Sequence, residues 1–490
     1  MNTKLSLSLL LPCALTACGF GDTSDGNPAA GIPNISLTNS QLGKSGGFVD
    51  INGDTKPDLI VGAPEAKASS GKEGVMLVYL KGADGFAETA STVLKGEANG
   101  DFFGFSYANL GDVNGDGKSD FAVGAINAEG DAGISGAAYV YQGGTNPPVL
   151  LAKLNGEQTF DKFGFAITGG DLNADGKNDI IVSAPYTFTE DPTHINDGYQ
   201  SGKVYIYFGG KTISTVPDVV ISGEKVNANI GFAIAADDIN GDGNSDLLFS
   251  ASSSAYVYFG GSDFKSRIAS SVVPSVNFGD GKGGSGFGRA IAVIGDVNGD
   301  GIKDVAISSP NRSVPSTYDN TGSVYVFKGS TGITGKILEN DTNYLLAKII
   351  GGGPGDRFGS AIAPAGDTDG DGKADFLVGA RWADSGMNPP RKITGNIYLF
   401  HGAELSPAMT IADAHIDLRQ EEFSSEYGST IAVDGDMVFG GMPAAYKHSG
   451  GIQLSDARHG TAVGGSQGGS VMPPPGGGGS GGGGGGTPHH

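Results

Sequence analysis

Cysteine is almost absent from this sequence, and basic residues are scarce. Of the 490 residues only Cys13 and Cys18 are cysteines, and both lie near the N-terminus. The remaining chain therefore contains no disulfide and no thiolate metal site. Lys and Arg together number 31 against 53 Asp and Glu, which gives a formal net charge of −22. Because nucleic-acid binding and adsorption to anionic lipid need clustered Lys and Arg, this balance argues against both.

A long hydrophobic run is missing as well. A membrane-spanning helix needs about 20 apolar residues, whereas the N-terminal segment MNTKLSLSLLLPCALTAC has one Lys followed by a 14-residue run without charge. This layout is typical of a secretory signal. The letters LTAC at residues 15–18 resemble the lipobox of bacterial lipoproteins, in which the Cys becomes the first mature residue and carries lipid. An ordinary signal that is cut nearby is the alternative.

The lipobox resemblance implies lipid on Cys18 and export to the bacterial cell envelope. Because Gly19 rather than Asp follows the Cys, it implies an outer-membrane lipoprotein. Residues 1–18 are then the signal peptide with its lipid-accepting Cys, and residues 19–33 are a flexible tether. Residues 461–490 are rich in Gly and Pro and are predicted to be disordered, because they cannot bury a core. The folded part is expected over residues 34–460.

An acidic nine-residue pattern, D-x-[DN]-x-D-[GT]-x-x-D, occurs six times, starting at residues 50, 112, 171, 238, 296 and 367. Successive copies start 62, 59, 67, 58 and 71 residues apart, so the chain is a repeat array. These acid loops hold 19 of the 53 acidic residues, three in each of five loops and four in the sixth. Carboxylates this close repel one another unless a cation lies among them.

The ligand types in the acid loops favour calcium. The first, third and fifth positions supply side-chain oxygens, the seventh a backbone carbonyl and the ninth a carboxylate, with Gly at the sixth for the sharp turn. Six or seven flexible oxygens suit Ca²⁺ better than the strict octahedron of Mg²⁺. An EF-hand is excluded because an apolar residue replaces the Glu of the twelfth position. The first loop is the weakest, since Thr55 replaces the Gly and Pro57 stiffens the turn.

The sequence thus predicts about six structural Ca²⁺ ions, each bound by one acid loop. The candidate ligands are Asp50, Asn52, Asp54, Lys56, Asp58, Asp112, Asn114, Asp116, Lys118, Asp120, Asp171, Asn173, Asp175, Lys177, Asp179, Asp238, Asn240, Asp242, Asn244, Asp246, Asp296, Asn298, Asp300, Ile302, Asp304, Asp367, Asp369, Asp371, Lys373 and Asp375. The residue at the seventh position contributes its backbone carbonyl.

Short β-branched and aromatic runs separated by Gly, Asn, Asp and Pro surround each acid loop, as in FGFAITGGDLNADGKNDIIVSAPY followed by GKVYIYFGG and VVISGE. This pattern predicts four antiparallel strands per unit, with the acid loop between the first and second strands. One Tyr recurs in the third strand of each unit and is predicted to pack between neighbouring sheets. These residues are Tyr79, Tyr139, Tyr205, Tyr256, Tyr325 and Tyr398.

A seventh unit, YGSTIAVDGDMVFGGMPAAY, replaces the acid loop by the short turn Asp434-Gly435-Asp436, which is predicted to be a solvated hairpin. The fold class is therefore all-β, a seven-bladed β-propeller of four-stranded blades, since closing a ring removes the exposed sheet edges. The last unit lacks a fourth strand. The stretch NISLTNSQLG at residues 34–43 is predicted to supply it and to close the ring.

Residues 35–458 resemble the FG-GAP repeats of integrin α-subunit propellers. The resemblance is clearest in three units, FGFAITGGDLNADGKNDIIVSAP, FGFSYANLGDVNGDGKSDFAVGAI and FGSAIAPAGDTDGDGKADFLVGAR. The resemblance implies a seven-bladed propeller with calcium in hairpin loops on one face and a ligand or partner on the opposite face, and it suggests adhesion. The sequence departs from the family because it has neither stalk domains nor a C-terminal transmembrane helix. No integrin β-subunit is therefore expected as a partner.

Several functions remain open at this point. The leading one is a binding module for an extracellular or envelope protein or glycan, attached to the membrane through its lipid anchor only. The alternatives are a hydrolase with a site built from propeller loops and a purely structural envelope protein. FG-GAP-like repeats also accompany glycosylphosphatidylinositol-specific phospholipase D, where a separate domain carries the chemistry. GKSGG at residues 43–47 matches G-x-S-x-G, but an acid loop rather than a helix follows it.

Loop lengths indicate where a partner would bind. The loop between the second and third strands of the fourth unit is very short, whereas those of its neighbours are long, which predicts a notch on the face opposite the acid loops. Tyr, Trp and Arg are favoured at binding hot spots. The alternative is that the long loops are tolerated surface insertions. The candidate partner-binding residues are Tyr186, Phe188, Tyr199, Arg312, Tyr318, Arg381 and Trp382.

Overall fold

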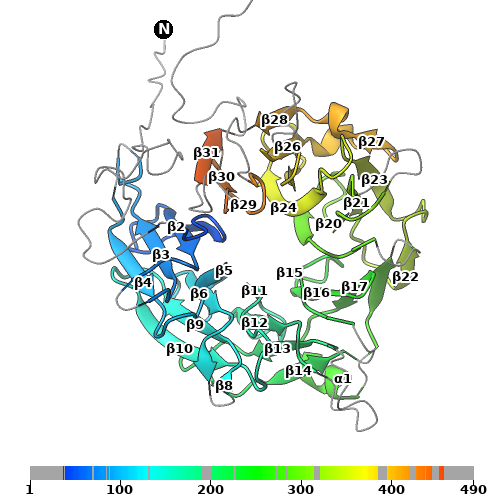
Figure 1. Ribbon diagram of the computed structural model, residues 1–490. Helices are drawn as coiled ribbons and strands as arrows, with labels where there is room; N and C mark the ends of the chain where they lie inside the picture. Colours follow the sequence, from blue (N-terminus) through cyan, green and yellow to red (C-terminus); the bar gives the residue numbers. More distant parts are fainter. Residues whose placement is uncertain are drawn as a thin grey trace, which may run out of the picture.

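The computed structural model of this chain describes residues 37, 39–68, 71–83, 85–87, 89–130, 133–188, 200–223, 228–270, 273–279, 281, 285–313, 320–383, 394–419, 426–435, 437–443 and 452–456. They form an all-β propeller whose sheets are arranged in a ring (Figure 1). No helix among the described residues is long and apolar enough to cross a membrane. The predicted signal with Cys18, the tether and the Gly-rich tail lie outside these residues.

Six blades are antiparallel sheets in which the strands follow one another from the centre of the ring outwards. The first three blades are β1 (Gly46–Val49), β2 (Asp58–Ala63), β3 (Val75–Tyr79) and β4 (Thr92–Lys95); β5 (Phe103–Gly111), β6 (Asp120–Ala125), β9 (Ala137–Gln142) and β10 (Val149–Asn155); and β11 (Ile167–Gly170), β12 (Asp179–Ala184), β13 (Lys203–Tyr207) and β14 (Val219–Ser222).

The next three blades have the same antiparallel core. They are β15 (Ile234–Asp237), β16 (Asp246–Ala251), β17 (Ser254–Tyr258) and β18 (Val276–Gly279); β19 (Ile291–Gly295), β20 (Asp304–Ser309), β21 (Ser323–Phe327) and β23 (Leu345–Ile350); and β24 (Phe358–Gly366), β25 (Asp375–Ala380), β26 (Asn396–Phe400) and β28 (Ile416–Arg419). Each acid loop joins the first two strands of its blade, as the sequence predicts.

Some elements were not predicted from the sequence. Fifth strands extend the fourth and fifth blades, and both pair in parallel with the fourth strand. A small hairpin and three short helices lie between blade strands. These elements are β22 (Gly335–Leu338), β27 (Met409–Thr410), β7 (Glu129–Gly130), β8 (Gly133–Ile134), α1 (Phe264–Ser270), η1 (Gly402–Glu404) and η2 (Ile411–Asp413).

A three-stranded sheet of β29 (Ile431–Asp434), β30 (Met437–Gly441) and β31 (Ile452–Asp456) lies between the sixth and first blades. Its inner strand β29 contacts both β24 and β1. The Asp434 side chain pairs with Lys81 of the first blade, with the Lys Nζ atom 3.0 Å from the Asp Oδ2 atom. Asp436 of the predicted hairpin lies outside the described residues. Of the predicted closing strand, residues 37 and 39–43 are described, and they contain no strand beyond a single bridge residue, Leu42.

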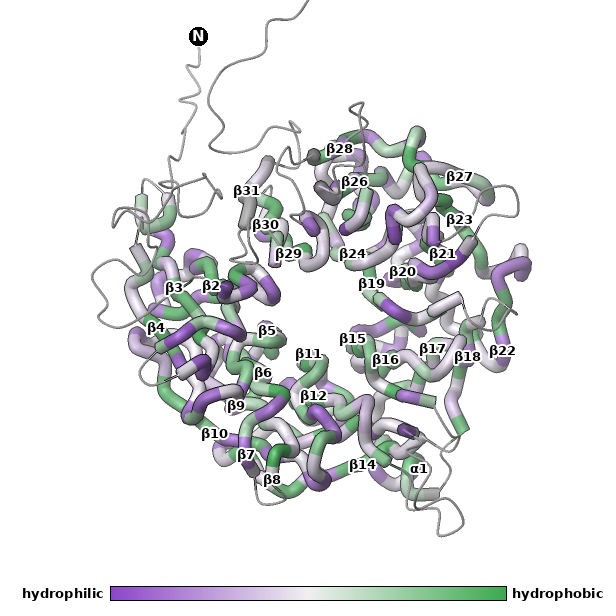
Figure 2. The backbone as a smooth tube through the Cα atoms, viewed as in Figure 1, coloured by the Kyte–Doolittle hydropathy of each residue, from purple (hydrophilic) through white to green (hydrophobic). Residues whose placement is uncertain are grey.

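The core lies between neighbouring blades. All six residues of each second strand are buried, because the next blades cover both faces of the sheet. Figure 2 shows hydrophobic strands alternating with hydrophilic turns around the ring. Five of the six recurrent third-strand Tyr residues are at most 3% exposed, and Tyr256 is half-buried. In the second blade the Tyr139 ring packs edge-on against Phe103, with 5.2 Å between centroids, and this arrangement recurs in the third, where Tyr205 packs on Phe163.

Two glycine positions explain why the motifs FG and GAP occur together. Each FG glycine has a φ between 82° and 91°, a left-handed conformation that favours Gly. The FG glycine lies against the penultimate residue of the second strand of the preceding blade. A methyl group on Gly62, Gly124 or Gly379 would lie 2.1–2.3 Å from the carbonyl oxygen of Gly104, Gly164 or Gly428, respectively. The other three blades have Ser183, Ser250 and Ser308 at this position, so every blade carries a small residue there.

Candidate metal loops and the FG rim

The first aspartate of each acid loop organises the turn. Its Oδ2 atom accepts a hydrogen bond from the backbone N–H of the sixth position at 2.7–2.9 Å in all six loops. In the second loop Asp112 Oδ1 also accepts from Gly115 and Asp116. The sixth residue needs a left-handed backbone, which Gly supplies in five loops, whereas Thr55 in the first loop adopts a φ of 71°. This strained Thr agrees with the view of the first loop as the weakest.

The side chains at the third and fifth positions also accept hydrogen bonds from backbone N–H groups of the loop. Asn114 Oδ1 accepts from the Asp116 N–H at 2.9 Å, and Asp116 Oδ1 accepts from Lys118 N–H at 3.0 Å. The Asn114 amide also donates to Asp116 at 3.3 Å and to Asp120 at 3.4 Å. The loop therefore directs the third, fifth and ninth side chains towards one point, before any cation is considered.

The ninth aspartate has a second role that the sequence did not reveal. Its Oδ2 atom accepts from the backbone N–H of the second loop position at 2.8–3.1 Å. Its Oδ1 atom accepts at 2.7–3.0 Å from a backbone N–H just after the third strand. All six of these carboxylates are buried. They fasten the acid loop to the blade, and in the fifth loop the Asn298 amide also donates to both oxygens of Asp304, at 3.1 and 3.0 Å.

Burial raises the pKa of the ninth carboxyl group in the first five loops, although the backbone hydrogen bonds oppose the change. The pKa reaches about 7 at Asp179, Asp246 and Asp304 and about 6 at Asp120. Burial also raises the pKa of Asp58. The neighbouring carboxylates of the same loop raise these pKa values further.

The sixth loop brings its carboxylates closest together. One oxygen each of Asp367, Asp369 and Asp375 lies within 4.8 Å of the other two. The buried His401 approaches the same loop, with 3.0 Å between its Nδ1 atom and Asp369 Oδ2, and its ring stacks on His415 with 4.0 Å between centroids. Oxygen donors alone, on a turn that already orients them, fit a hard divalent cation.

Neighbouring acid loops are bonded to one another around this rim of the ring, which we term the metal rim. The carbonyl of Asp112 accepts from the Asn178 N–H of the third loop at 2.9 Å. The same bond joins Asp171 to Ser245 at 3.1 Å and Asp296 to Ala374 at 2.9 Å. A cation that fixes one loop therefore also fixes the contact with the next blade.

The opposite rim, where the FG dipeptides and the loops between second and third strands lie, is termed the FG rim. A cavity of about 510 Å³ lies at its centre. In every repeat the residue directly after the FG glycine lines this cavity. The sequence patterns did not predict this. These seven residues are Lys44, Phe105, Phe165, Phe232, Arg289, Ser360 and Ser429. The three phenylalanines are consecutive, so one side of the cavity is aromatic and the other is basic and polar.

Two hollows lie beside the short loop of the fourth blade. Ser252 lines both the central cavity and a second one of about 320 Å³, which Ser253 and Ser254 also line. Most of the long loops that define the predicted notch lie outside the described residues, so the notch stays a prediction.

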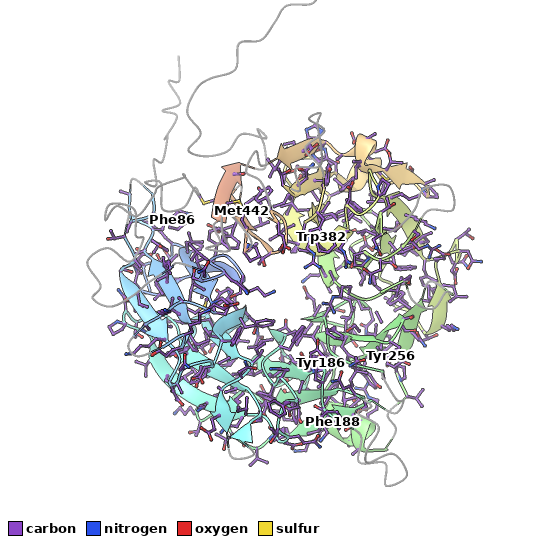
Figure 3. All side chains as sticks on the ribbon, in the orientation of Figure 1. Phe86, Tyr186, Phe188, Tyr256, Trp382 and Met442 are labelled. Carbon is purple, nitrogen blue, oxygen red and sulfur yellow. The ribbon has the colours of Figure 1, made fainter. Side chains whose placement is uncertain are left out.

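The predicted partner-binding residues do not form one group. Tyr186 packs edge-on against Phe232 with 5.5 Å between centroids. Arg381 lines the central cavity from the sixth blade, and its guanidinium lies 5.1 Å from the centre of the Trp382 ring (Figure 3). Phe188 is 39% exposed. Arg312 is instead largely buried in an ion pair with Glu339, at 3.2 Å. Tyr199 and Tyr318 lie outside the described residues.

The GKSGG segment has a structural role in this rim. The Ser45 hydroxyl is buried and donates to the Gly104 carbonyl at 2.8 Å, which joins the first blade to the second. Ser106 and Ser360 make the same contact with the next blade, at 2.7 and 3.1 Å.

Comparison with known proteins agrees with this architecture. The FG-GAP repeat family matches residues 42–75, 163–207, 287–327 and 358–400. Integrin alpha-4 of Xenopus laevis is 28% identical over 269 residues, which cover 54% of this chain and 24% of that protein. Integrin alpha-6 of Gallus gallus is 34% identical over 228 residues, 44% of this chain and 19% of that protein.

Human phosphatidylinositol-glycan-specific phospholipase D is similar over a shorter stretch. It is 35% identical over 165 residues, which cover 30% of this chain and 19% of that protein. The chain thus matches about a fifth to a quarter of the length of these relatives.

Proposed function

From a chain of FG-GAP repeats folded as an integrin-alpha-like propeller, we propose a calcium-stabilised binding module that meets an extracellular or envelope protein at its FG rim. The observation that carries this proposal is that the two rims of the ring present different side chains. One rim holds six acid loops, and in the sixth one oxygen each of Asp367, Asp369 and Asp375 lies within 4.8 Å of the other two. The other rim holds aromatic and cationic side chains around a central cavity. The resemblance to integrin alpha subunits supports adhesion or binding as the general role.

Calcium is the cation we assign to the acid loops. Extracellular calcium sites have dissociation constants of about 10⁻⁴ to 10⁻³ M. At a tenfold excess over that constant each independent site adds about 1.4 kcal/mol, so six sites add roughly 8 kcal/mol. That is comparable with the whole stability of an ordinary domain. When bound, the cation would neutralise the loop carboxylates, while the backbone bonds to the first and ninth aspartates set the loop shape.

The ring itself we propose to be seven-bladed, with the sheet of β29, β30 and β31 as the seventh blade. A methyl group on Gly441 would lie 2.1 Å from the Gly43 carbonyl, the same contact that joins the other blades. The Thr430 hydroxyl donates to the Lys44 carbonyl at 2.9 Å, across 386 residues of sequence. Leu37 packs in a cluster with Leu59 of the first blade and Phe439 of β30, which supports closure of this seam by residues 34–43.

The partner-binding role is tested by a screen with the purified protein. Host matrix proteins, envelope glycans and periplasmic proteins are immobilised and probed in calcium. For a partner found in this way, Trp382→Ala and Tyr318→Ala should each weaken binding by at least about 1 kcal/mol and leave the melting temperature nearly unchanged. Loss of binding on substitution of exposed metal-rim residues, with these two variants unaffected, would place the partner on the metal rim.

We propose that the protein is attached to the outer membrane of a bacterial cell envelope by lipid on Cys18. The lipobox-like LTAC segment supports this proposal. In the host cell, Cys18→Ser should release the protein from the membrane fraction or stop its maturation. A variant that is processed normally and remains in the membrane fraction would overturn the proposed anchor.

A further inference from the structure

Four cations surround the central cavity of the FG rim, in a protein whose formal net charge is −22. Lys44 and Arg289 are residues that follow FG glycines, Arg357 precedes the FG of the sixth blade, and Arg381 follows β25. The one carboxylate that acts on this group is Glu426, which accepts from the Trp382 indole N–H at 3.2 Å. Within the described residues, four positive charges therefore stand against one negative charge.

Aromatic rings position these cations without neutralising them. The Lys44 ammonium lies 4.8 Å from the centre of the Phe105 ring, and the Arg289 guanidinium lies 4.5 Å from that of Phe232. Arg357 and Arg381 lie over Trp382 at 4.2 and 5.1 Å. Such contacts fix the plane of a guanidinium group and leave its N–H edge available.

The N–H groups of these side chains are largely unused. The Nε atoms of Arg357 and Arg381 are buried and have no hydrogen-bond partner among the described residues. Arg357 makes one neutral hydrogen bond, to Asn311 Oδ1 at 3.0 Å. None of the four cations forms an ion pair within the part of the chain that the structure describes. The like charges act on each other, since burial and the nearby Arg381 lower the pKa of Lys44.

A buried N–H group without an acceptor is costly to the folded protein, so the unsatisfied Nε atoms of Arg357 and Arg381 need an explanation beyond stability. An anion that enters the cavity would supply the missing acceptors, and a carboxylate matches the fork of an Arg side chain. The cavity of about 510 Å³ falls in the range of ligand pockets and admits a few side chains. Phe105, Phe165 and Phe232 offer an apolar wall on the opposite side.

We infer that the central cavity of the FG rim is a recognition site for an acidic peptide segment of a partner protein, one that carries Asp or Glu beside an aromatic or aliphatic residue. This inference deepens the proposed binding function, since it assigns the chemistry of the ligand at the same rim. A protein segment is favoured over a polyanionic glycan because the cations converge in one hollow with an aromatic wall. A repeating polyanion is better matched by an extended basic track.

The single Trp of the chain makes the site directly observable. Trp382 lies against Arg357 and Arg381, which line the cavity, so its fluorescence reports on these two residues. The exported chain in saturating calcium is titrated with the blocked peptide acetyl-Gly-Phe-Glu-Glu-Gly-amide and with matched peptides in which Gln-Gln or Lys-Lys replaces Glu-Glu. Binding is measured in parallel by calorimetry. The acidic peptide should change the fluorescence and bind at least about tenfold more tightly than the Gln peptide, and the Lys peptide should not bind.

Substitutions then assign the effect to the cations. Arg381→Gln and Arg357→Gln should each weaken binding of the acidic peptide at least about tenfold, and salt from about 50 to about 500 mM should weaken it further. Lys265→Gln is the matched control, because Lys265 lies over Phe208 at 5.8 Å but is paired with Asp218. Arg381→Gln should leave the melting temperature unchanged or higher, because it removes a charge that repels Lys44. A lower melting temperature would show that Arg381 serves stability and would contradict the assignment.

Three outcomes overturn the inference. The first is equal affinity for the Glu and Gln peptides, and the second is binding that neither Arg substitution weakens. The third is tighter binding of a sulfated tetrasaccharide than of the acidic peptide, which would assign the cavity to glycans. A partner that binds the FG rim while the acidic peptide does not would leave the proposed function standing and reject this inference alone. Peptide binding without any partner from the screen would leave this inference standing and reject the proposed function.

Discussion

At the scale of single residues, the ion pairs of this protein differ greatly in how much they stabilise the fold. Glu339 forms the strongest example. Its carboxylate accepts from Lys348 at 3.0 Å and from Arg312 at 3.2 Å. Burial alone would raise the pKa of Glu339, but the hydrogen bond and charge of Lys348, together with the charge of Arg312, lower it to about 2. The ionised form is thus favoured in the folded state.

Replacing Glu339 by Gln should therefore destabilise the protein by about 1–2 kcal/mol at neutral pH, after allowance for solvent screening. A lowered pKa stabilises the fold above the ordinary value of 4.5, and this contribution is lost as the pH falls from there towards 2. Denaturant unfolding of both proteins between pH 7 and about pH 3 measures the difference. The difference in unfolding free energy between Glu339→Gln and the parent protein should shrink as the pH falls. The exposed variant Glu404→Gln should show no such difference from the parent protein. A gap that stays constant with pH would contradict the account.

The glycine contacts between blades give a second residue-scale prediction. A methyl group on Gly124 would lie 2.2 Å from the Gly164 carbonyl and from the Ser106 hydroxyl. Gly124→Ala should therefore cost at least about 1–3 kcal/mol, because backbone must move. Gly332 has nothing within 4 Å of such a methyl group and serves as the control. Calorimetry should show a clearly lower melting temperature for Gly124→Ala alone, and equal values for both variants would refute the contact.

At the scale of elements, each acid loop is a hairpin, and the proposed function assigns one calcium ion to it. Asp116→Ala removes a carboxylate that faces Asn114 and leaves the backbone bonds of Asp112 and Asp120 in place. We expect it to abolish calcium binding at one loop and to lower the melting temperature in calcium by a few degrees. In chelator the variant should match the parent protein, and exposed Glu404→Ala should match it in both conditions. A deficit that persists in chelator would show that Asp116 acts through the fold instead.

The elements that the sequence predicts best are those with a repeated local signal. The acid loops, the four-strand order and the buried third-strand Tyr residues all follow from patterns that recur in each unit. The fifth strands β22 and β27 and helix α1 have no such repeat, because they are insertions between the third and fourth strands of single blades. The partner-binding candidates were less accurate for a different reason. Arg312 looks available in sequence, but Glu339 lies 27 residues away and only the fold brings the two together.

The residues that line the central cavity show the same limit of prediction from sequence. The residue after each FG glycine was visible in the sequence, yet its seven members are chemically unlike. They include Lys, Arg, Phe and Ser, so no conserved type marks the position. The ring geometry, rather than composition, makes these residues neighbours.

At the scale of the whole molecule, stability depends on contacts that pass from blade to blade around the ring. The metal rim contributes bonds between adjacent loops, such as that from Asn178 to the Asp112 carbonyl, and the FG rim contributes the glycine contacts. Under the proposed function calcium binds the acid loops that form the first set, so its removal should weaken several seams together rather than one blade. Chelation should therefore lower the melting temperature by many degrees in one cooperative transition.

Calorimetry of the exported chain, with calcium binding measured on the same sample, tests the central claim most directly. The protein is stripped with chelator, checked by metal analysis, and titrated with calcium while heat of binding and melting temperature are followed. The account predicts about six bound ions, a melting temperature that rises as they bind, and about one ion fewer for Asp116→Ala. A metal-free protein that melts at the same temperature as the calcium-saturated one would contradict it.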